Sequence, residues 1–350
     1  MSDHSYRLLH LSAEEKRALK VIFLAKQAPL TVDSPKPEIH EQFGVEPRYN
    51  HEIFSLLREM GIDCVPCRSL DVFAGLARNA NYVFTLFNRA DFRNGEIFVS
   101  LQCEKFGIPY LGAPPNVRAL AEDKSFAKHV ARSVGLKTAP WKTYGFHTDL
   151  EPPSFAGPYF VKPRFGAASD GVALDSIQDE WSGLKTKIES LLAQGKDAIV
   201  EQCIDGTDLT VPVLGGTQPI VLDVVEEVSD LPSGICTYRQ KRLLDKGRFR
   251  RILDSVLVTK EVLSGVERFC AHVSPFDYLR VDFHLCKKTQ DAFFLEFNIG
   301  CNLGSHAGVM FAAANQGIDQ QSVIEHILAY SLRRQSNSVS HVIERASAFA

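Results

Sequence analysis

Two neighbouring segments in the last third of the chain constrain the fold more than any other feature. Residues 276–285 read FDYLRVDFHL, residues 292–298 read AFFLEFN, and a short polar segment joins them. Apolar and polar residues alternate in both, which is the two-residue period of a β-strand. The short polar connection predicts an antiparallel hairpin with one apolar and one polar face.

The polar face of this hairpin predicts a metal site. Asp282 lies between Arg280 and His284 in the alternation of the first strand, and Glu296 and Asn298 share the polar side of the second. Two carboxylates and an amide oxygen form the all-oxygen donor set that Mg²⁺ prefers. A solvated amphipathic hairpin is the alternative, but two carboxylates within such apolar strands favour a site. We expect the other face to hold Leu279, Val281, Phe283, Leu285, Phe293, Leu295 and Phe297, with Phe294 on the polar side.

A lysine before a loop of small residues is a second candidate feature. Lys162 ends the apolar strand predicted over 159–163, and the loop 164–171 contains Gly, Ala and Ser residues. Small residues allow backbone N–H groups to approach a phosphate, and a lysine adds a point charge. The loop is not a P-loop, because the pattern G-x-x-x-x-G-K-[ST] is absent. Lys124, at the start of a helix predicted over 122–134, would on its own be a solvated surface lysine.

The order of the predicted elements indicates the α/β class. In the first third, strands at 19–25 and 82–87 alternate with helices, which predicts a parallel sheet. Strands dominate from Asp208 onward, so the C-terminal part is expected to be α+β. We also expect strands at 171–174 and 197–204, helices at 178–193, 257–273, 307–317 and 320–334, and a frayed polar tail.

Composition excludes several classes of protein. The 350 residues carry a net charge of −3 and are 45% hydrophobic, which is typical of a folded globular chain of two or three domains. No apolar run is long enough to span a bilayer, and the N-terminus lacks the apolar core of a secretory signal, so we expect a cytoplasmic protein. The near-balanced charge argues against a nucleic-acid binder. Cys64 and Cys67 form a C-x-x-C, but without a second pair we expect inert thiols rather than a zinc or redox site.

The motifs occur in the order and spacing of the ATP-grasp ligases, and the chain resembles more narrowly the D-alanine–D-alanine ligase group. The resemblance extends from about residue 80 to 330 and includes FGIPYLGAPP at 106–115 and NIGCNLGSHAG at 298–308. It implies a three-domain ATP-grasp fold with a Rossmann-like N-terminal domain. The implied parts are an N-terminal domain at 1–113, a central lid domain at 114–201, a C-terminal domain at 202–335, and a flexible tail at 336–350.

The resemblance implies that ATP binds between the second and third domains. Lys124 and Lys162 would hold the α and β phosphates, with Lys241 as a further phosphate lysine. Ser169 and Gly171 in the lid loop would cover the γ phosphate. The remaining implied nucleotide contacts are Glu201 with the adenine amino group, Cys203 and Ile204 with the adenine ring, and Asp208, where the family has a glutamate, with the ribose hydroxyls.

The same resemblance implies the chemistry of a carboxylate–amine ligase. Asp282, Glu296 and Asn298 would hold Mg²⁺, with Mn²⁺ as an alternative. Arg280 would stabilise the acyl phosphate and the tetrahedral intermediate, helped by a backbone N–H from the loop around Asn302. The implied partners are a small carboxylate and an amine, with neither nucleic acid nor membrane, and the family also suggests a homodimer.

Departures from the family motifs bear on the substrates. Phe87 and Asn88 replace a His-Gly pair, Ala167 and Ala168 remove hydroxyls from the lid, and Ala307 replaces a substrate-binding serine. We therefore expect a specialised amino-acid or dipeptide ligase. The alternatives are a D-alanine–D-alanine ligase of cell-wall synthesis and a non-catalytic ATP-binding module.

Three further features have open roles. His284 and His306 could each transfer a proton, although a structural role is the simpler interpretation. The basic run 239–251 is a solvated loop or a segment that binds an anionic substrate or phosphates; RNA or DNA binding is a third option, which the modest overall charge does not favour.

Overall fold

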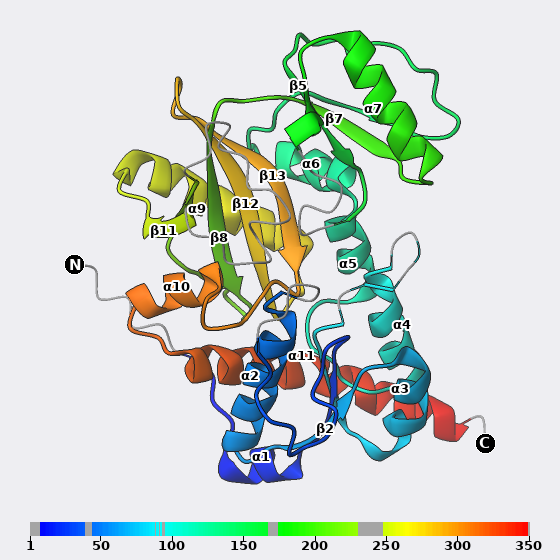
Figure 1. Cartoon of the computed structure of the whole chain (residues 1–350). Helices are drawn as coiled ribbons and strands as arrows, with labels where there is room; N and C mark the ends of the chain where they lie inside the picture. The colour runs from blue at the N-terminus through cyan, green and yellow to red at the C-terminus, as the bar shows by residue number, and fades with distance from the viewer. Residues whose placement is uncertain are drawn as a thin grey trace.

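The computed structural model describes residues 8–38, 44–87, 89–90, 92, 95–166, 174–229 and 248–348. Within these ranges the strands form three sheets. In Figure 1 a four-stranded sheet lies at one end of the molecule, a three-stranded sheet lies at the other, and a six-stranded sheet lies between them.

The first sheet is parallel, as the alternation of strands and helices predicts. β1 (Lys20–Leu24) pairs with β2 (Asp63–Cys67) on one side and β3 (Tyr82–Thr85) on the other. Parallel strands need crossover connections, and helices supply them here. These helices are α2 (Glu46–Glu59) and α3 (Leu70–Leu76), while the short α1 (Ala13–Ala18) precedes the sheet and α4 (Ile97–Phe106) follows its last strand.

The second sheet carries the strand that contains Lys162. β5 (Tyr159–Pro163) pairs antiparallel with β7 (Ala198–Gln202), and α7 (Trp181–Ala193) packs on the sheet around a small apolar core. The expected strand at 171–174 is wrong at Leu174, which begins a 3-10 turn, and 171–173 lie outside the described residues. β4 (Trp141–Tyr144) and β6 (Ile177–Gln178) complete the sheet.

The third sheet contains the predicted hairpin. β8 (Gly206–Leu214) lies between β10 (Val225–Ser229) and β12 (Tyr278–Cys286), and β13 (Ala292–Ile299) pairs with β12. The other edge is β11 (Arg248–Ile252), so the end of the basic run expected as a loop is a strand, because it pairs with β10. The short β9 (Ile220–Val221) pairs with β8.

The apolar face of this sheet is covered by three helices. α5 (Pro115–Glu122), α6 (Lys124–Ser133) and α9 (Val256–Val273) share one core with β8, β12 and β13. Leu279, Val281 and Phe283 face this core, which confirms the predicted inward side of the first strand. The polar side of β12 therefore lies on the opposite face of the sheet from this core.

A β-bulge changes the expected alternation of the second strand. Asp282 is opposite Glu296, but Phe283 is opposite Phe294, so Leu295 is an extra residue without a partner in this register. Because the extra residue shifts the alternation, Phe294 is fully buried, and of the residues predicted to face inward from this second strand only Phe297 is equally buried. Phe293 and Leu295 are only partly buried, and the prediction for these three residues was wrong.

The last helix of the chain packs against the N-terminal sheet. α10 (Gly308–Asn315) matches its prediction, but α11 (Gln320–Ala348) continues well past the predicted end at residue 334. Side chains of α11 such as Ile324 and Leu328 share a core with β1 and β3. The three-domain boundaries predicted from the sequence remain a prediction.

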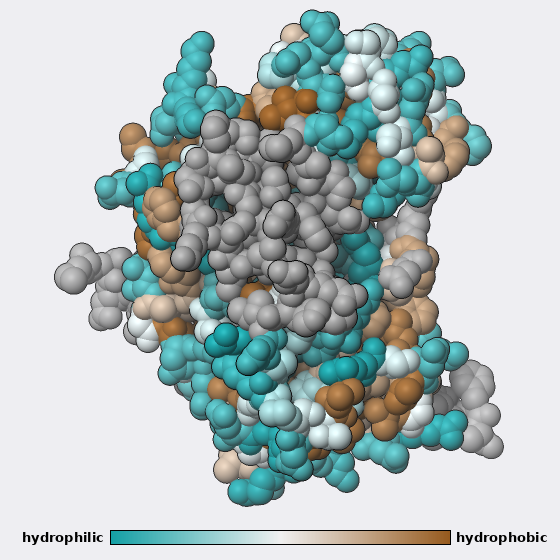
Figure 2. Space-filling view, viewed as in Figure 1, coloured by the Kyte–Doolittle hydropathy of each residue, from teal (hydrophilic) through white to brown (hydrophobic). Residues whose placement is uncertain are grey.

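On the face drawn in Figure 2, the side chains outside the grey segments form no continuous apolar belt. Outside the grey segments hydrophilic side chains predominate, and the hydrophobic ones form separate patches. Across the described ranges, no helix has both the length and the apolar character that crossing a bilayer requires.

Candidate active site

The predicted metal-binding residues lie together on the polar face of the hairpin. Asp282 is opposite Glu296 and Arg280 is opposite Asn298. The Asn298 amide nitrogen donates to Asp282 Oδ2 at 2.9 Å, and Thr210 Oγ1 on β8 donates to Asp282 Oδ1 at 2.6 Å. Three strands thus fix the position of the Asp282 carboxylate.

Arg280 binds the same carboxylate. Its Nε and Nη2 atoms donate to the two oxygens of Asp282 at 2.7 and 2.6 Å, which is a bidentate ion pair. Burial lowers the pKa of Arg280, but the attraction of Asp282 outweighs it and raises the pKa overall. The site therefore always contains a fixed guanidinium charge.

The two predicted phosphate lysines lie beside each other and next to the hairpin. Lys124 Nζ is 3.7 Å from Glu296 Oε2 and donates to the carbonyl of Gly166, where the lid loop begins. Lys162 Nζ is 2.9 Å from Glu201 Oε1. The Lys124–Glu296 contact joins the phosphate lysines to the predicted metal face.

A third lysine, which the sequence interpretation missed, completes this cluster. Lys128 is fully buried, and its Nζ lies 3.2 Å from Glu201 Oε2 and 3.1 Å from the carbonyl of Phe294. The only available signal was its position four residues after Lys124, on the same face of the helix. The structure places the Glu201 side chain between two ammonium groups, and its predicted contact with adenine remains a prediction.

Burial and ion pairing set the charges of this cluster. Burial raises the pKa of Glu201, but Lys128 and Lys162 outweigh it, so the pKa is lowered and the group is a carboxylate. Burial also opposes the charge of Lys162, yet Glu201 and Glu296 raise its pKa overall. For Lys124 burial dominates and lowers the pKa. A new negative charge, such as a phosphate, would stabilise the ammonium form of Lys124.

An aspartate just before Lys124 links α6, which carries Lys124, to the end of β5, which carries Lys162. Asp123 caps α6 by accepting from the N–H groups of Ser125 and Phe126. Its Oδ1 and Oδ2 atoms also accept hydrogen bonds from Nε and Nη2 of Arg164, at 2.9 and 2.6 Å. Since Arg164 directly follows β5, this ion pair holds Lys162 close to the N-terminus of α6.

A second buried charged cluster lies beside Gly166. Arg89 Nη2 is 2.9 Å from Glu122 Oε1 and 3.5 Å from Glu96 Oε1. Burial raises the pKa of Glu96 to about 7, despite the attraction of Arg89. A Cβ on Gly166 would lie 3.0 Å from Arg89 Nη1, so this cluster contacts the start of the lid.

The predicted adenine and ribose residues lie at the crossing from β7 to β8. The N–H of Cys203 donates to the carbonyl of Pro158 at 2.8 Å, so that group is already used within the protein. The carbonyl of Ile204 is 3.0 Å from His284 Nε2, and Asp208 Oδ1 is 2.8 Å from His284 Nδ1. His284 therefore contacts two of the predicted nucleotide residues.

The loop after β13 is held by the N-terminal part of the chain. Asn302 Oδ1 accepts from the N–H of Gly304 at 2.7 Å, and Leu303 N donates to the hydroxyl of Tyr49 at 3.2 Å. Ser305 N donates to Glu52 Oε1 at 2.7 Å. The Asn302 side chain thus shapes its own loop, and its catalytic role remains a prediction.

A charged pair supports the far end of this loop. Arg250 on β11 lies 2.7 Å from Glu227 Oε1 and donates to the carbonyl of His306 at 2.6 Å. Burial lowers the pKa of His306. Ser169, Gly171 and Lys241 lie outside the described residues.

The donor set fits a magnesium ion by its chemistry. Asp282, Glu296 and Asn298 bring carboxylate and amide oxygens to one face, which is the ligand type that Mg²⁺ takes. Over the part of the chain that the structure describes, no group of three His, Cys, Asp or Glu residues has metal-binding geometry.

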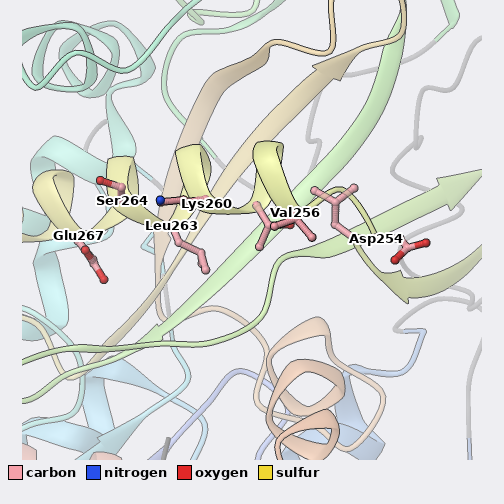
Figure 3. A pocket seen from close by; sticks show the side chains of 8 residues that line it. Asp254, Val256, Lys260, Leu263, Ser264 and Glu267 are labelled. Atoms are coloured by element: carbon pink, nitrogen blue, oxygen red, sulfur yellow. The ribbon is translucent and has the colours of Figure 1, made fainter. Parts of the chain in front are cut away.

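Two other features lie outside this site. A surface groove of about 550 Å³ runs along α9 and is lined by residues such as Leu253, Val256 and Leu263, none of which is a predicted site residue (Figure 3).

The seven described cysteines are free, and Cys64 and Cys67 are buried. Burial raises the pKa of Cys64 to about 12, which agrees with an inert thiol.

Comparison with known proteins identifies the family. The profile of the family described as D-ala D-ala ligase C-terminus matches residues 130–329. D-alanine–D-alanine ligase of Aquifex aeolicus is 26% identical over 79% of this chain and 89% of its own length, and that of Bordetella pertussis is 30% identical over 65% and 71%. An uncharacterized protein of Sinorhizobium fredii, y4sG, is 29% identical over 74% and 77%.

Solved structures agree in fold. The crystal structure of D-alanine–D-alanine ligase from Bacillus anthracis complexed with ATP matches with a TM-score of 0.71 at 17% identity, covering 92% of this chain and all of that one. The matching fold confirms the predicted ATP-grasp architecture. From the family match and these relatives, the chain belongs to the D-alanine–D-alanine ligase family of ATP-dependent ligases, which form C–N bonds.

Proposed function

We propose that this ligase activates a small carboxylate, an amino acid, as an acyl phosphate, which the amine of a second substrate then attacks. The observation that carries the proposal is the contact between Lys124 and Glu296, which joins three lysines to the acidic hairpin face. Phosphoryl transfer needs positive charge around the transferring group rather than a side-chain nucleophile. The three lysines beside the hairpin face supply this positive charge.

The proposed reaction has two steps. A carboxylate oxygen of the first substrate attacks the γ phosphorus of ATP, and the bond to ADP breaks. The amine then attacks the acyl carbon, loses a proton, and phosphate leaves as the amide forms. Lys124 and Lys162 would bind the phosphates of ATP, with Ser169, Gly171 and Lys241 as predicted additional contacts. Arg280, whose position Asp282 fixes, would stabilise the developing oxyanion.

We assign the metal role to the hairpin face. Asp282, Glu296 and Asn298 would hold Mg²⁺, which when bound neutralises charge on the phosphates. The protein's own contribution is to keep Asp282 in place through Thr210 and Asn298, and to keep Arg280 directed at the same face.

For the substrates, we propose amino acids other than two D-alanines. The support is the loop after β13, in which Ala307 replaces the family's serine and is buried, while Arg250 and Glu227 lie beside it. A second candidate is D-alanine–D-alanine ligation, which the named functions of the relatives favour. The cytoplasmic location and the homodimer remain predictions.

A screen of substrates tests the proposal. Purified protein with ATP and Mg²⁺ is given pairs of amino acids and small carboxylates, with D-alanine included, and ADP release is measured with mass detection of products. We expect ADP release that depends on both substrates, and a product equal in mass to their sum less one water. Formation of D-alanyl-D-alanine alone would select the second candidate. ATP binding without turnover on any pair would leave only the non-catalytic module.

Two variants test the metal assignment. Glu296→Gln and Asn298→Ala are expected to lower turnover at least about 100-fold, because charge stabilisation by a metal is worth several kcal/mol and about 1.4 kcal/mol is tenfold. Glu261→Gln on α9, where the glutamate side chain is 65% exposed, is the matched control. Near wild-type turnover in both site variants, with circular dichroism unchanged, would contradict the assignment.

A further inference from the structure

His284 makes two contacts that the proposed chemistry does not use. It lies on β12 directly opposite Asp208 on β8. Its Nδ1 is 2.8 Å from Asp208 Oδ1, and its Nε2 is 3.0 Å from the carbonyl oxygen of Ile204. One ring therefore links the crossing segment after β7 to a side chain on the sheet. In Figure 1, β8 and β12 run side by side in the six-stranded sheet.

The surroundings of Asp208 explain why it needs a partner. Across the sheet Asp208 is opposite His284 on one side and Glu227 on the other. Two carboxylates directly opposite each other on neighbouring strands destabilise a sheet. Arg250, opposite Glu227 on β11, binds Glu227 at 2.7 Å. His284 is the corresponding partner of Asp208, so each of the two adjacent carboxylates has a basic side chain on its outer side.

The backbone approaches this imidazole so closely that one residue has to be glycine. A Cβ on Gly206 would lie 2.0 Å from the carbonyl oxygen of Leu285 and 2.9 Å from Cδ2 of His284. Both distances are shorter than real Cβ contacts, so the chain between Ile204 and Asp208 can pass here only without a side chain at 206. This close passage brings the Ile204 carbonyl within reach of the ring.

We propose that His284 is a positioning residue for the nucleotide: its ring, anchored on the carbonyl of Ile204, holds Asp208 in the orientation that binds the ribose hydroxyls. The proposal rests on the proposed function, in which Asp208 contacts ribose. Aspartate is one methylene shorter than glutamate, so its carboxylate has less reach and its orientation matters more. The Asp208 side chain is 32% exposed and the His284 side chain 17%, so the carboxylate remains accessible from outside while the ring supports it.

Nucleotide binding isolates the ribose contribution. Calorimetry compares ATP with 2′,3′-dideoxy-ATP, which lacks both hydroxyls, on wild type, His284→Phe and His284→Gln. We expect His284→Phe to weaken ATP about tenfold, because a hydrogen-bonded carboxylate loses its support, and to leave the dideoxy analogue within about twofold. Glutamine carries two N–H donors, so His284→Gln should keep more of the preference for ATP. In turnover assays the Phe variant should raise KM for ATP with kcat nearly unchanged.

Controls separate this proposal from a structural effect. Lys287→Ala, directly after the same hairpin strand and paired with the exposed Asp205, should change neither affinity. Asp208→Asn should remove the preference for ATP over its dideoxy analogue. If His284→Phe weakens both nucleotides equally, or weakens neither, the positioning role is wrong. Because binding is measured without acid or amine substrates, a failure of the ligase proposal would appear separately, as absent turnover in wild type.

Discussion

The buried cluster of Lys128, Glu201 and Lys162 allows a quantitative prediction. Lys128→Met keeps a side chain of similar length but removes the ammonium group 3.2 Å from Glu201 Oε2. Removing one partner of a buried ion pair costs about 3–5 kcal/mol, because the other charge stays buried without compensation. Lys162 remains 2.9 Å from the other oxygen of Glu201, so we expect the lower end, about 3 kcal/mol.

Tryptophan fluorescence during urea unfolding measures this loss. The chain has two tryptophans, Trp141 and Trp181, and the Lys128 ammonium lies 5.9 Å from the ring of Trp141. The fluorescence therefore reports on the part of the protein in which the charge is removed. Lys185→Met is the matched control, because Lys185 forms an exposed pair with Glu189 at 3.9 Å on α7 and should change stability by less than about 0.5 kcal/mol.

A double variant tests the physical reason. Lys128→Met combined with Glu201→Gln removes the buried charge together with its partner, so its loss should be smaller than the sum of the two single losses. Additive losses, or a Lys128→Met midpoint equal to that of Lys185→Met, would refute the argument that an uncompensated buried carboxylate carries the cost.

The remaining predictions concern titration and thiol reactivity. Burial raises the pKa of Glu96 from its ordinary 4.5 to about 7. The folded state therefore binds more protons than the unfolded state in this window, and stability should fall as pH rises from about 4.5 to 7. Glu96→Gln should remove that slope, and its stability relative to wild type should increase by about 2–3 kcal/mol between pH 5 and 8 in urea titrations; a pH-independent difference would contradict it. Among the thiols, hydrogen bonds with Thr289 lower the pKa of Cys286, whereas burial raises that of Cys64. In a disulfide-exchange assay on the folded protein, Cys286→Ser should remove one fast-reacting thiol, whereas Cys64→Ser should remove no fast-reacting thiol. Fast labelling of Cys64 would contradict the conclusion that this thiol is buried and unreactive.

Local periodicity predicted the elements whose pattern is set by neighbours in the chain. The prediction of the apolar face of β12 was correct, because the alternation of side chains is a property of a single strand. The second hairpin strand was partly wrong because a bulge at Leu295 is decided by pairing with β12, which periodicity cannot show. The parallel first sheet was predictable from alternating strands and helices.

The site residues likewise fall into those that the sequence could predict and those that it could not. Asp282, Glu296 and Asn298 could be grouped from sequence because a short turn brings the two strands together. Lys128 could not, because its partner Glu201 lies on another sheet and only the folded chain brings them into contact. His284 was visible as a residue of the polar face, but its contacts with Ile204 and Asp208 depend on the pairing of β8 with β12, which are far apart in sequence.

The core shared by the first sheet and α11 has a consequence for synthesis on the ribosome. Leu11 N donates to Glu325 Oε1 at 3.0 Å, and the hydroxyl of Tyr82 on β3 donates to Ser331 at 2.8 Å. Apolar side chains of β1 and β3 are buried against Val323, Ile324 and Ile327. Although the first strands are translated first, they cannot bury this surface until nearly the whole chain has emerged. Contacts of such long sequence separation form late and slowly. The N-terminal sheet is therefore the part of the nascent chain that stays exposed longest, and the part most in need of protection from aggregation.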